Sequence, residues 1–412
     1  MSEAVTEATT MTGSQHIDLV ESWAAHNYHP LPVVIERAEG VWVEDVDGKR
    51  YMDMLAAYSA VNFGHGHPEL LEAARQQLDK VTLTSRAFHN DQLGPLCQEL
   101  AELCGMEMVL PMNTGAEAVE TAIKTARKWG YTIKGVAPDR AQIICCDGNF
   151  HGRTTTVVSF STDPQCRDGF GPFTPGFEII EYGNAAALEA AITEDTVAFL
   201  AEPIQGEAGI IVPPDGYWEQ VREICDRKNV LFIADEIQSG LGRTGTTFCM
   251  DLVGVKPDIF ILGKALGGGV MPISAVVSSR EILGVFNPGD HGSTFGGNPL
   301  ACAVARRVVA MLKTGEYQAH AKEMGDYLFG LLGTLDFEGI REIRGRGLWV
   351  GIELHEWAGK GKAFCMKLRE LGLLCKDTHE QAIRLAPPLV ITKDEIDWAF
   401  ERLQKVLSAP AN

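Results

Sequence analysis

Residues 230–264 read VLFIADEIQSGLGRTGTTFCMDLVGVKPDIFILGK, and this stretch decides the fold. It contains two short apolar runs, VLFIADE and IFILG, which lack the alternation of polar and apolar residues typical of a half-exposed strand. Strands that are buried on both faces of a parallel sheet show such continuous apolar runs. Asp235 lies near the end of the first run, and the second run leads to Lys264. The stretch therefore predicts two buried strands, each with a charged residue at its carboxyl end.

The rest of the central region repeats this pattern. The runs QIICC (142–146) and VAFLAEP (197–203) are also apolar throughout, and helical stretches separate them. Thr114 and Glu117 form a capping box that predicts the start of a helix, directly after the strand-like run MVLPM. Asn298-Pro299 predicts the start of another helix. Strands alternating with helices predict an α/β fold with a mostly parallel central sheet.

The two chain ends follow a different pattern. The segment from Val41 to Leu55 predicts a hairpin around Asp47-Gly48. Strand-like runs return at GLWVGIEL and QAIRLAPPLVI, and a capping box at Thr392 opens a final helix. We expect the two ends to form a smaller α+β domain. The predicted divisions are a flexible tail over 1–20, an N-terminal segment of the small domain over 21–63, a large domain over 64–310 and a C-terminal small domain over 311–412.

Composition excludes several classes of function. The chain has 412 residues and a net charge of −19, which argues against sequence-independent binding of nucleic acid. The ten cysteines include no C-x-x-C pair, so we expect buried thiols in a reducing compartment. No window has the apolar length of a membrane span. The N-terminal stretch MSEAVTEATTMTGSQ has no arginine and does not resemble a targeting peptide, which favours a cytoplasmic location.

One motif suggests a nicotinamide cofactor. Gly240, Gly242 and Gly245 form a literal G-x-G-x-x-G. That fingerprint binds pyrophosphate only where a helix opens within it. The following residues, TTFCMDL, lack helical periodicity, and no acidic residue ends the next strand. We interpret the motif as a glycine-rich loop.

Asp235 and Lys264 can face one crevice, because ligands of open α/β sheets bind at the carboxyl ends of the strands. For an isolated pair, a buried ion pair is the simpler interpretation. Three other features suggest a cofactor site: a capped helix start at Gly115 that suits a phosphate, Phe150 after the strand QIICC, and the hydroxyl of Thr294 among glycines. Together they suit pyridoxal phosphate, which needs a lysine amine, an acidic partner for its ring nitrogen, an aromatic cover and a phosphate site.

The motifs ADEIQSGLGRTG, ILGKALGGG, AEPIQGEAG and HGSTFGGNPL resemble those of the class III aminotransferases, which are pyridoxal-phosphate enzymes of fold type I. The resemblance extends from about residue 20 to 400. The segments AHNYHPLP, YSAVNFGHGHP, LTSRAFHN, LPMNTGAEA and RLAPPLVI are most similar to the members of this family that act on ornithine. The resemblance implies a homodimer with active sites at its interface. It also implies cofactor roles for Lys264 (Schiff base), Asp235 (ring nitrogen), Gln238 (ring hydroxyl), Gly115 and Ala116 (phosphate amides), Phe150 (ring stacking) and Thr294 (phosphate of the neighbouring subunit).

For the substrate, the resemblance implies that Tyr28 and Arg153 bind the α-amino and α-carboxylate groups of ornithine, and that Tyr58 lines the pocket. Glu207 would pair with Arg384 while ornithine is bound and release it for 2-oxoglutarate. Such masking removes the attraction of a free arginine for the α end of ornithine. The reaction implied is transfer of the δ-amino group of L-ornithine to 2-oxoglutarate, which gives glutamate 5-semialdehyde and glutamate.

Other functions stay open. Within the family, the amino donor can instead be N-acetylornithine or 4-aminobutyrate, although two tyrosines favour the free α-amine of ornithine. A pyridoxal-phosphate isomerase or racemase, or a non-catalytic binding protein, fits the residues less well. His151 stands where some relatives carry tryptophan, and we expect it to lie behind the residues that touch the cofactor. His65 and His67 suggest a metal site, but no third ligand is in sight, and we interpret them as a turn before a helix at Pro68.

Overall fold

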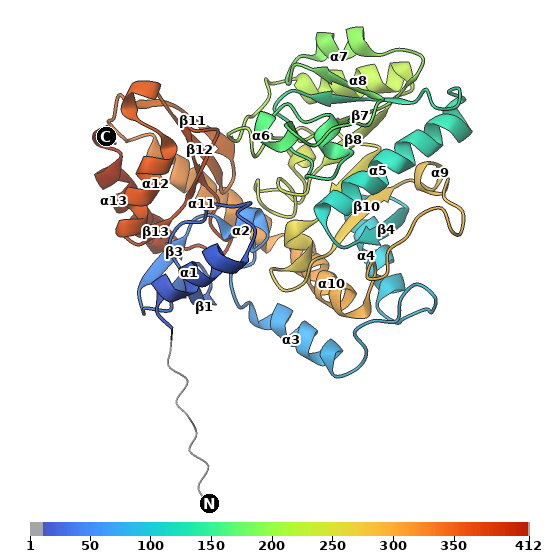
Figure 1. The fold of residues 1–412 in the computed structure, drawn as a ribbon. Coiled ribbons are helices and arrows are strands. Elements are labelled where there is room, and N and C mark those ends of the chain that lie inside the picture. Colours follow the sequence, from blue (N-terminus) through green and yellow to red (C-terminus); the bar gives the residue numbers. More distant parts are fainter. Residues whose placement is uncertain (1–10, 411–412) are drawn as a thin grey trace, which may run out of the picture.

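The computed structural model describes residues 11–410, which form two lobes (Figure 1). One lobe contains the blue and red ends of the chain, and the other contains its cyan to yellow middle. The flexible tail predicted over residues 1–20 is wrong for residues 13–20, which belong to helix α1 (Gly13–Trp23). Thr12 caps this helix, and its side chain accepts a hydrogen bond from the Gln15 amide. This local capping starts a helix despite the polar composition of the segment; residues 1–10 lie outside the described part of the chain.

The large lobe is built on a seven-stranded sheet with the strand order β4-β10-β9-β8-β7-β5-β6. Within it, β10 is the antiparallel strand, and the neighbouring pairs from β9 to β6 are parallel, as predicted. The strands β7, β8 and β9 are buried along their whole length, because helices cover both faces. The bounds are β4 (Met108–Met112), β5 (Gln142–Cys146), β6 (Phe177–Ile180), β7 (Thr196–Ala201), β8 (Leu231–Asp235), β9 (Ile259–Leu262) and β10 (Ser274–Ser278).

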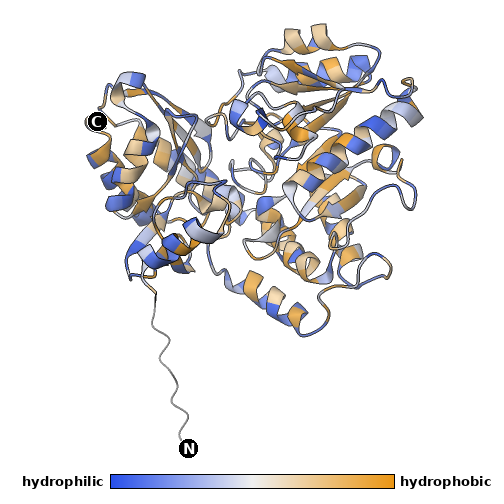
Figure 2. Ribbon diagram, in the orientation of Figure 1, coloured by the Kyte–Doolittle hydropathy of each residue, from blue (hydrophilic) through white to orange (hydrophobic). Residues whose placement is uncertain are grey.

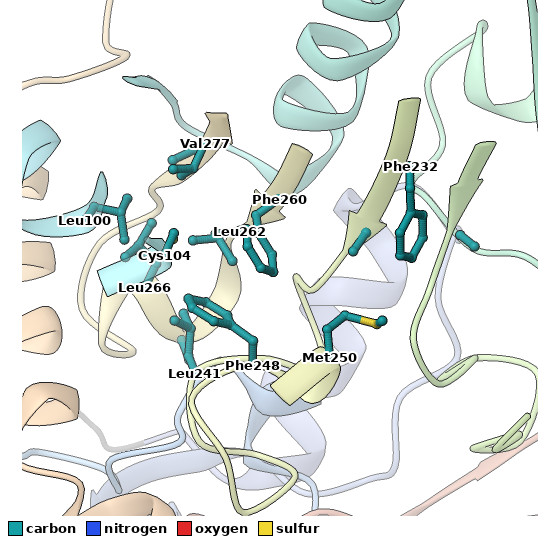
Figure 3. Packing of buried hydrophobic residues seen from close by; sticks show 14 of the residues in the cluster. Leu100, Cys104, Phe232, Leu241, Phe248, Met250, Phe260, Leu262, Leu266 and Val277 are labelled. Atoms are coloured by element: carbon teal, nitrogen blue, oxygen red, sulfur yellow. The ribbon is translucent and has the colours of Figure 1, made fainter. Parts of the chain in front are cut away.

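Alternate residues of each central strand contribute to two separate cores. Phe232 of β8 belongs to a cluster with Phe260 and Leu262 of β9 and Met250 (Figure 3), whereas Ile233 belongs to the cluster on the opposite face of the sheet. Burial of each large apolar side chain contributes roughly 1.5–3 kcal/mol to folding. The helices of this lobe are α3 (Pro68–Leu78), α4 (Leu93–Cys104), α5 (Gly115–Trp129), α6 (Pro164–Arg167), α7 (Ala185–Ala191), α8 (Tyr217–Lys228), α9 (Arg280–Leu283) and α10 (Pro299–Lys313). Hydropathy colouring shows the apolar residues concentrated in the strands and on the inner sides of these helices (Figure 2).

The smaller lobe contains two four-stranded sheets, with the strand orders β1-β2-β3-β13 and β11-β12-β15-β14. The predicted hairpin is present as the antiparallel pair of β2 and β3, and Gly48 in its turn has a φ of +83°. The strand-like run 381–391 forms a strand only over β15, because two prolines follow it. The elements are β1 (Ile35–Glu39), β2 (Trp42–Asp45), β3 (Arg50–Asp53), α2 (Ala56–Ser59), α11 (Glu316–Leu332), β11 (Ile340–Arg346), β12 (Trp349–Leu354), α12 (Gly361–Glu370), β13 (Leu373–Leu374), β14 (Lys376–Thr378), β15 (Ala382–Leu385) and α13 (Lys393–Val406).

The chain ends meet in the smaller lobe. Strand β13 pairs in parallel with β3, and one hydrophobic cluster contains Met52 and Met54 together with Leu385 and Leu403. This packing joins segments that are more than 300 positions apart in the sequence. None of the helices in the described part of the chain has both the length and the apolar character needed to cross a membrane.

Candidate active site

A cavity of about 200 Å³ lies at the carboxyl ends of the central strands. Loops that follow β4, β5, β7, β8 and β9 all reach it, as expected for an open parallel sheet. Six of the predicted site residues line this cavity: Gly115, Ala116, Phe150, Asp235, Gln238 and Lys264. The structure therefore brings together residues that are up to 149 positions apart in the sequence.

Asp235 is the last residue of β8 and is held by two hydrogen bonds. The amide of Ile237 donates to its Oδ1 at 3.1 Å, and Nδ1 of His151 lies 2.7 Å from its Oδ2. The His151 ring is buried. Burial favours the neutral imidazole, but the hydrogen bond and charge of Asp235 outweigh it and raise the pKa of His151. His151 lines the same cavity as Asp235, not a position behind it as we expected, and its hydrogen bond fixes the carboxylate there.

Lys264 follows β9 and begins a short 3₁₀ helix, η4 (Lys264–Gly267). Its backbone has a φ of +45°, which is unusual for a residue with a side chain and is characteristic of strained functional sites. Burial lowers the pKa of the Lys264 ammonium to about 8. A lysine with this pKa supplies a neutral, nucleophilic amine far more readily than a lysine in water.

The remaining groups fit pyridoxal phosphate. Thr114 caps α5, and within the described chain the amides of Gly115 and Ala116 have no hydrogen-bond partner, so two donors at a helix N-terminus face the cavity. The Nε2 of Gln238 is buried without a partner in the same part of the structure. Phe150 provides an aromatic face. The two amides suit a phosphate, the Gln238 amide suits a ring oxygen, and Phe150 suits the face of a pyridine ring.

Glu207 and Arg384 form an ion pair between the two lobes. Arg384 is buried on β15 and donates to Glu207 through Nη1 at 2.5 Å and Nη2 at 3.1 Å. Burial acts to raise the pKa of Glu207, but Arg384 outweighs it and holds that pKa below its usual value; Lys264 acts in the same direction. The pair is therefore closed and ionised, with two hydrogen bonds in a fork.

Tyr58 lies against Arg384, with the guanidinium 5.0 Å from the ring centre. It belongs to α2, in which Ala56, Ala57, Tyr58 and Ser59 all have φ between +47° and +69°. Such a left-handed turn of residues that are not glycine is costly and persists only where the surroundings enforce it. This turn directs the Tyr58 ring toward the ion pair.

Tyr28, Arg153 and Thr294 lie outside the cofactor cavity. The Arg153 guanidinium is 5.7 Å from the rings of both Tyr28 and Phe150, so Arg153 connects the exposed Tyr28 to the cavity wall. Tyr28 is 66% exposed. Thr294 is exposed too, and its neighbour Ser293 accepts a hydrogen bond from the side-chain amide of Asn113 at 2.8 Å.

Glu202 is a cavity residue that the sequence analysis missed. It follows β7 and accepts hydrogen bonds from the amides of Phe150 at 3.0 Å and Gly206 at 3.2 Å. Burial raises its pKa to about 7. The sequence could have predicted this position, because Glu202 follows an apolar run just as Asp235 does.

Two motifs have other roles. The segment from Gly240 to Gly245 is a series of turns, and no α-helix opens within it, which removes the basis for a dinucleotide fingerprint. His65 lies 2.8 Å from Asp53, and His67 lies 3.0 Å from the Tyr317 hydroxyl. Helix α3 begins at Pro68, as predicted.

Comparison with known proteins agrees with this geometry. The family model described as "Aminotransferase class-III" matches residues 23–407. An ornithine aminotransferase from Geobacillus sp. (strain WCH70) is 57% identical over 95% of this chain and 98% of its own length. An ornithine aminotransferase from Toxoplasma gondii, solved with pyridoxal phosphate (PLP) partly occupying its active site, superposes with a TM-score of 0.95 at 45% identity, over 97% of this chain and 95% of that one.

A second solved structure, an acetylornithine aminotransferase from Elizabethkingia anophelis, has a TM-score of 0.88 at 45% identity and covers 97% of this chain and 99% of its own. The family model matches nearly the whole chain, and the Geobacillus protein is 57% identical to it over almost its full length. The large lobe, with its mostly parallel sheet, agrees with fold type I. The chain therefore belongs to the class III aminotransferases.

Proposed function

We propose that this chain transfers the δ-amino group of L-ornithine to 2-oxoglutarate and forms L-glutamate 5-semialdehyde and L-glutamate. The observation that carries this proposal is the closed pair of Glu207 and Arg384 beside Lys264. A pocket that takes a diamino acid by its distal amine and then a dicarboxylate needs an arginine that can be masked. The curated relatives at 54–58% identity support the same substrate.

Pyridoxal phosphate supplies an aldehyde that condenses with amines and a ring that accepts electrons when a substrate proton leaves. Asp235 binds the ring nitrogen, and its carboxylate keeps that nitrogen protonated. Gln238 donates to the ring oxygen, and Phe150 covers one ring face. The amides of Gly115 and Ala116 bind the phosphate, where the N-terminus of α5 favours negative charge.

Lys264 holds and moves the proton. Its amine, with a pKa near 8, is partly neutral at neutral pH and can take a proton from the substrate carbon and return it elsewhere. The strand β9 places this amine at the same sheet edge as Asp235.

Tyr28 and Arg153 bind the α-amino and α-carboxylate groups of ornithine, and Tyr58 lines the pocket beside Arg384. While ornithine is bound, Glu207 stays paired with Arg384. The α-carboxylate of ornithine then has no unpaired Arg384 to bind, and the α-amine is not drawn toward Lys264. When 2-oxoglutarate enters, Glu207 releases Arg384, which then binds a carboxylate with its fork of N–H donors.

We also propose a homodimer with active sites at the interface. Thr294 would reach the phosphate of the neighbouring subunit, since it is exposed on its own chain. Phe295, next to it, is 55% exposed, and Phe88 is 73% exposed, which is the apolar surface that a partner covers. The large domain over 64–310 then carries the cofactor, and the small domain over 311–412, joined by the segment 21–63, carries Arg384.

A cytoplasmic location is consistent with the cysteines. All ten are free thiols, and eight of them are buried. Such thiols persist in reducing compartments.

N-acetylornithine as donor is the second candidate, since one similar structure is an acetylornithine aminotransferase. The two donors differ at the α-amine: Tyr28 provides a hydroxyl for a free amine, whereas an acetyl group needs apolar space. An isomerase or racemase needs only one substrate and therefore no masked arginine. These differences make the α end of the substrate the decisive place to test.

The test compares kcat/KM for ornithine, N-acetylornithine and 4-aminobutyrate with 2-oxoglutarate as acceptor. We expect ornithine to give the highest value. Higher kcat/KM for N-acetylornithine would overturn the substrate assignment. Reduction of the loaded enzyme with borohydride and peptide mapping provides an independent check, because the label must reside on Lys264.

A further inference from the structure

Glu207 lies on a short loop that is closed at its base. We call residues Gln205–Ile211 the gate loop. The amide of Gln205 donates to the carbonyl of Ile211 at 3.1 Å, and the Ile211 amide donates back at 3.0 Å. The Gly206 amide also donates to Glu202. These bonds fix the base of the gate loop on the large lobe.

The smaller lobe holds the other end of the gate loop. Arg344 of β11 donates to the carbonyl oxygen of Gly209 from both Nε (2.9 Å) and Nη2 (2.7 Å). Its remaining donors bind Glu342 at 2.9 Å and Glu353 at 2.7 Å, so the guanidinium is itself held in place. A charged fork on a single carbonyl oxygen is a strong and directional contact.

A second contact lies at the gate residue itself. The hydroxyl of Thr378, in β14, donates to the backbone carbonyl of Glu207. Thr378 is buried. The carbonyl belongs to Glu207 itself, so this bond fixes the backbone that carries the Glu207 side chain.

The gate loop also packs directly on β12, the strand paired with the one that carries Arg384. A Cβ at Gly351 of β12 would lie 2.8 Å from the carbonyl oxygen of Gly209, so that position has room only for glycine. Gly351 is the register partner of Arg384 in the antiparallel pair of β12 and β15. The gate loop and Arg384 are thus fixed to the same strand pair.

We propose that Arg344 and Thr378 are positioning residues for the gate: they hold the gate loop to the sheet β11-β12-β15-β14, in which β15 carries Arg384, so that Arg384 is released by rotation of the Glu207 side chain and not by displacement of the loop. This inference rests on the proposed gate function of Glu207. A movement of the smaller lobe carries the tip of the gate loop and Arg384 together and leaves their separation unchanged.

The exposures of the two partners support side-chain rotation. The Glu207 side chain is 30% exposed, whereas that of Arg384 is 2% exposed. Glu207 therefore has space into which it can turn, and Arg384 has none. A carboxylate that leaves the pair toward solvent also regains hydration, which lowers the cost of unmasking.

The test measures which nitrogen of ornithine is transferred. Ornithine with a heavy nitrogen isotope at either the α or the δ position is converted with 2-oxoglutarate, and the label in glutamate is read by mass spectrometry. For Arg344→Gln we expect the ratio of α to δ transfer to rise about 3- to 30-fold, because a displaced gate loop masks Arg384 less well. Arg341→Gln, on the same strand but exposed and with no side-chain hydrogen bond in the described chain, is the control and keeps the wild-type ratio.

A double-variant cycle separates positioning from general destabilisation. If Arg344 acts through Glu207, then adding Arg344→Gln to Glu207→Ala leaves the nitrogen ratio of Glu207→Ala unchanged. Thr378→Val provides a second variant should Arg344→Gln fail to fold, and Thr378→Ser, which keeps the hydroxyl, restores the ratio.

Three results would overturn the proposal. They are a wild-type ratio in both Arg344→Gln and Thr378→Val, a further change of the ratio in the double variant, or an equal change in Arg341→Gln. A wild-type enzyme that transfers no δ-nitrogen would instead refute the proposed function itself, and the inference with it.

Discussion

The two ends of the active site differ in how the chain builds them. The proposed cofactor end consists of residues at the ends of neighbouring strands in one sheet, such as Asp235 and Lys264, and these residues all belong to the large lobe. The proposed substrate end consists of Tyr28 from an exposed N-terminal segment, Glu207 from a loop of the large lobe and Arg384 from the smaller lobe. One end rests on strand register and the other on contacts between distant segments.

This difference separates what must stay fixed from what must change. In the proposed function the cofactor keeps the same contacts in both half-reactions, and the buried bond between His151 and Asp235 would serve that constancy. In the proposed function two substrates alternate at the other end, and there a carboxylate that is 30% exposed masks a buried guanidinium. We therefore expect substitutions at the cofactor end to reduce activity with every substrate, and substitutions at the substrate end to change selectivity.

The largest effect is expected for Lys264→Ala. Loss of the amine removes the group that moves the proton, and kcat should fall by roughly 10²- to 10⁴-fold or more for both half-reactions. Stopped-flow absorbance of single turnovers measures this. Lys228→Ala, at an exposed lysine of α8, is the control. Retention of more than a tenth of the activity in Lys264→Ala would show that the cofactor end is assigned wrongly.

The pKa of Lys264 gives a prediction for the enzyme without cofactor. Burial lowers this pKa from 10.5 to about 8, and the protonated amine does not attack an aldehyde. The rate of covalent capture of added pyridoxal phosphate should therefore rise about tenfold per pH unit below pH 8 and level off above it. A rate that keeps rising through pH 10 would indicate an unshifted lysine.

Glu207→Ala tests the substrate end. With Arg384 unmasked, we expect glutamate to bind about tenfold more tightly and a larger share of ornithine to react at its α-amine. Titration of the cofactor absorbance with glutamate gives the affinity, and product analysis gives the regiochemistry. Glu219→Ala, at an exposed glutamate of α8, is the matched control. If Glu207→Ala left both quantities at wild-type values, the gate would be refuted.

His151→Phe tests the fixed end more gently. The substitution keeps an aromatic ring but removes the hydrogen bond to Asp235, so pyridoxal phosphate should dissociate about 10-fold more readily. Selectivity between ornithine and glutamate should not change. His151→Asn retains an N–H donor and should recover part of the affinity. A selective loss of ornithine turnover would contradict the separation of the two ends.

The smallest effect concerns two matched helix caps. Thr114 and Thr392 form the same capping box, at the start of α5 and of α13. Replacement of either by alanine should reduce the free energy of unfolding by about 1 kcal/mol. Only Thr114→Ala should also weaken cofactor binding, by a few-fold, because only α5 opens at the cavity. Equal cofactor affinity in the two variants would show that the phosphate does not bind at the N-terminus of α5.

Much of the large lobe could be predicted from the sequence. Continuous apolar runs identified β5, β7, β8 and β9, and capping residues identified the start of α5. The ends of those strands then located Asp235 and Lys264, because a parallel sheet gathers its strand ends at one edge. The turn dipeptide Asp47-Gly48 likewise predicted the hairpin of β2 and β3.

Tertiary contacts set the remainder, and local sequence does not encode them. The left-handed turn at Tyr58 contains no glycine from which it could be predicted, and the surrounding structure enforces it. The pairing of Glu207 with Arg384 joins residues 177 positions apart and could be expected only from the resemblance to a family. The bond between His151 and Asp235 and the buried position of Glu202 also depend on side-chain directions that no periodicity fixes.

The central claim is that the masked arginine directs the reaction to the distal amine of ornithine. The most direct measurement uses the wild-type enzyme loaded with pyridoxal phosphate, with 2-oxoglutarate and with ornithine that carries a heavy nitrogen isotope only at the δ position. Mass spectrometry of the glutamate formed should show the isotope in nearly every molecule. Glutamate without the isotope would mean that the α-amine is transferred, and it would contradict the account.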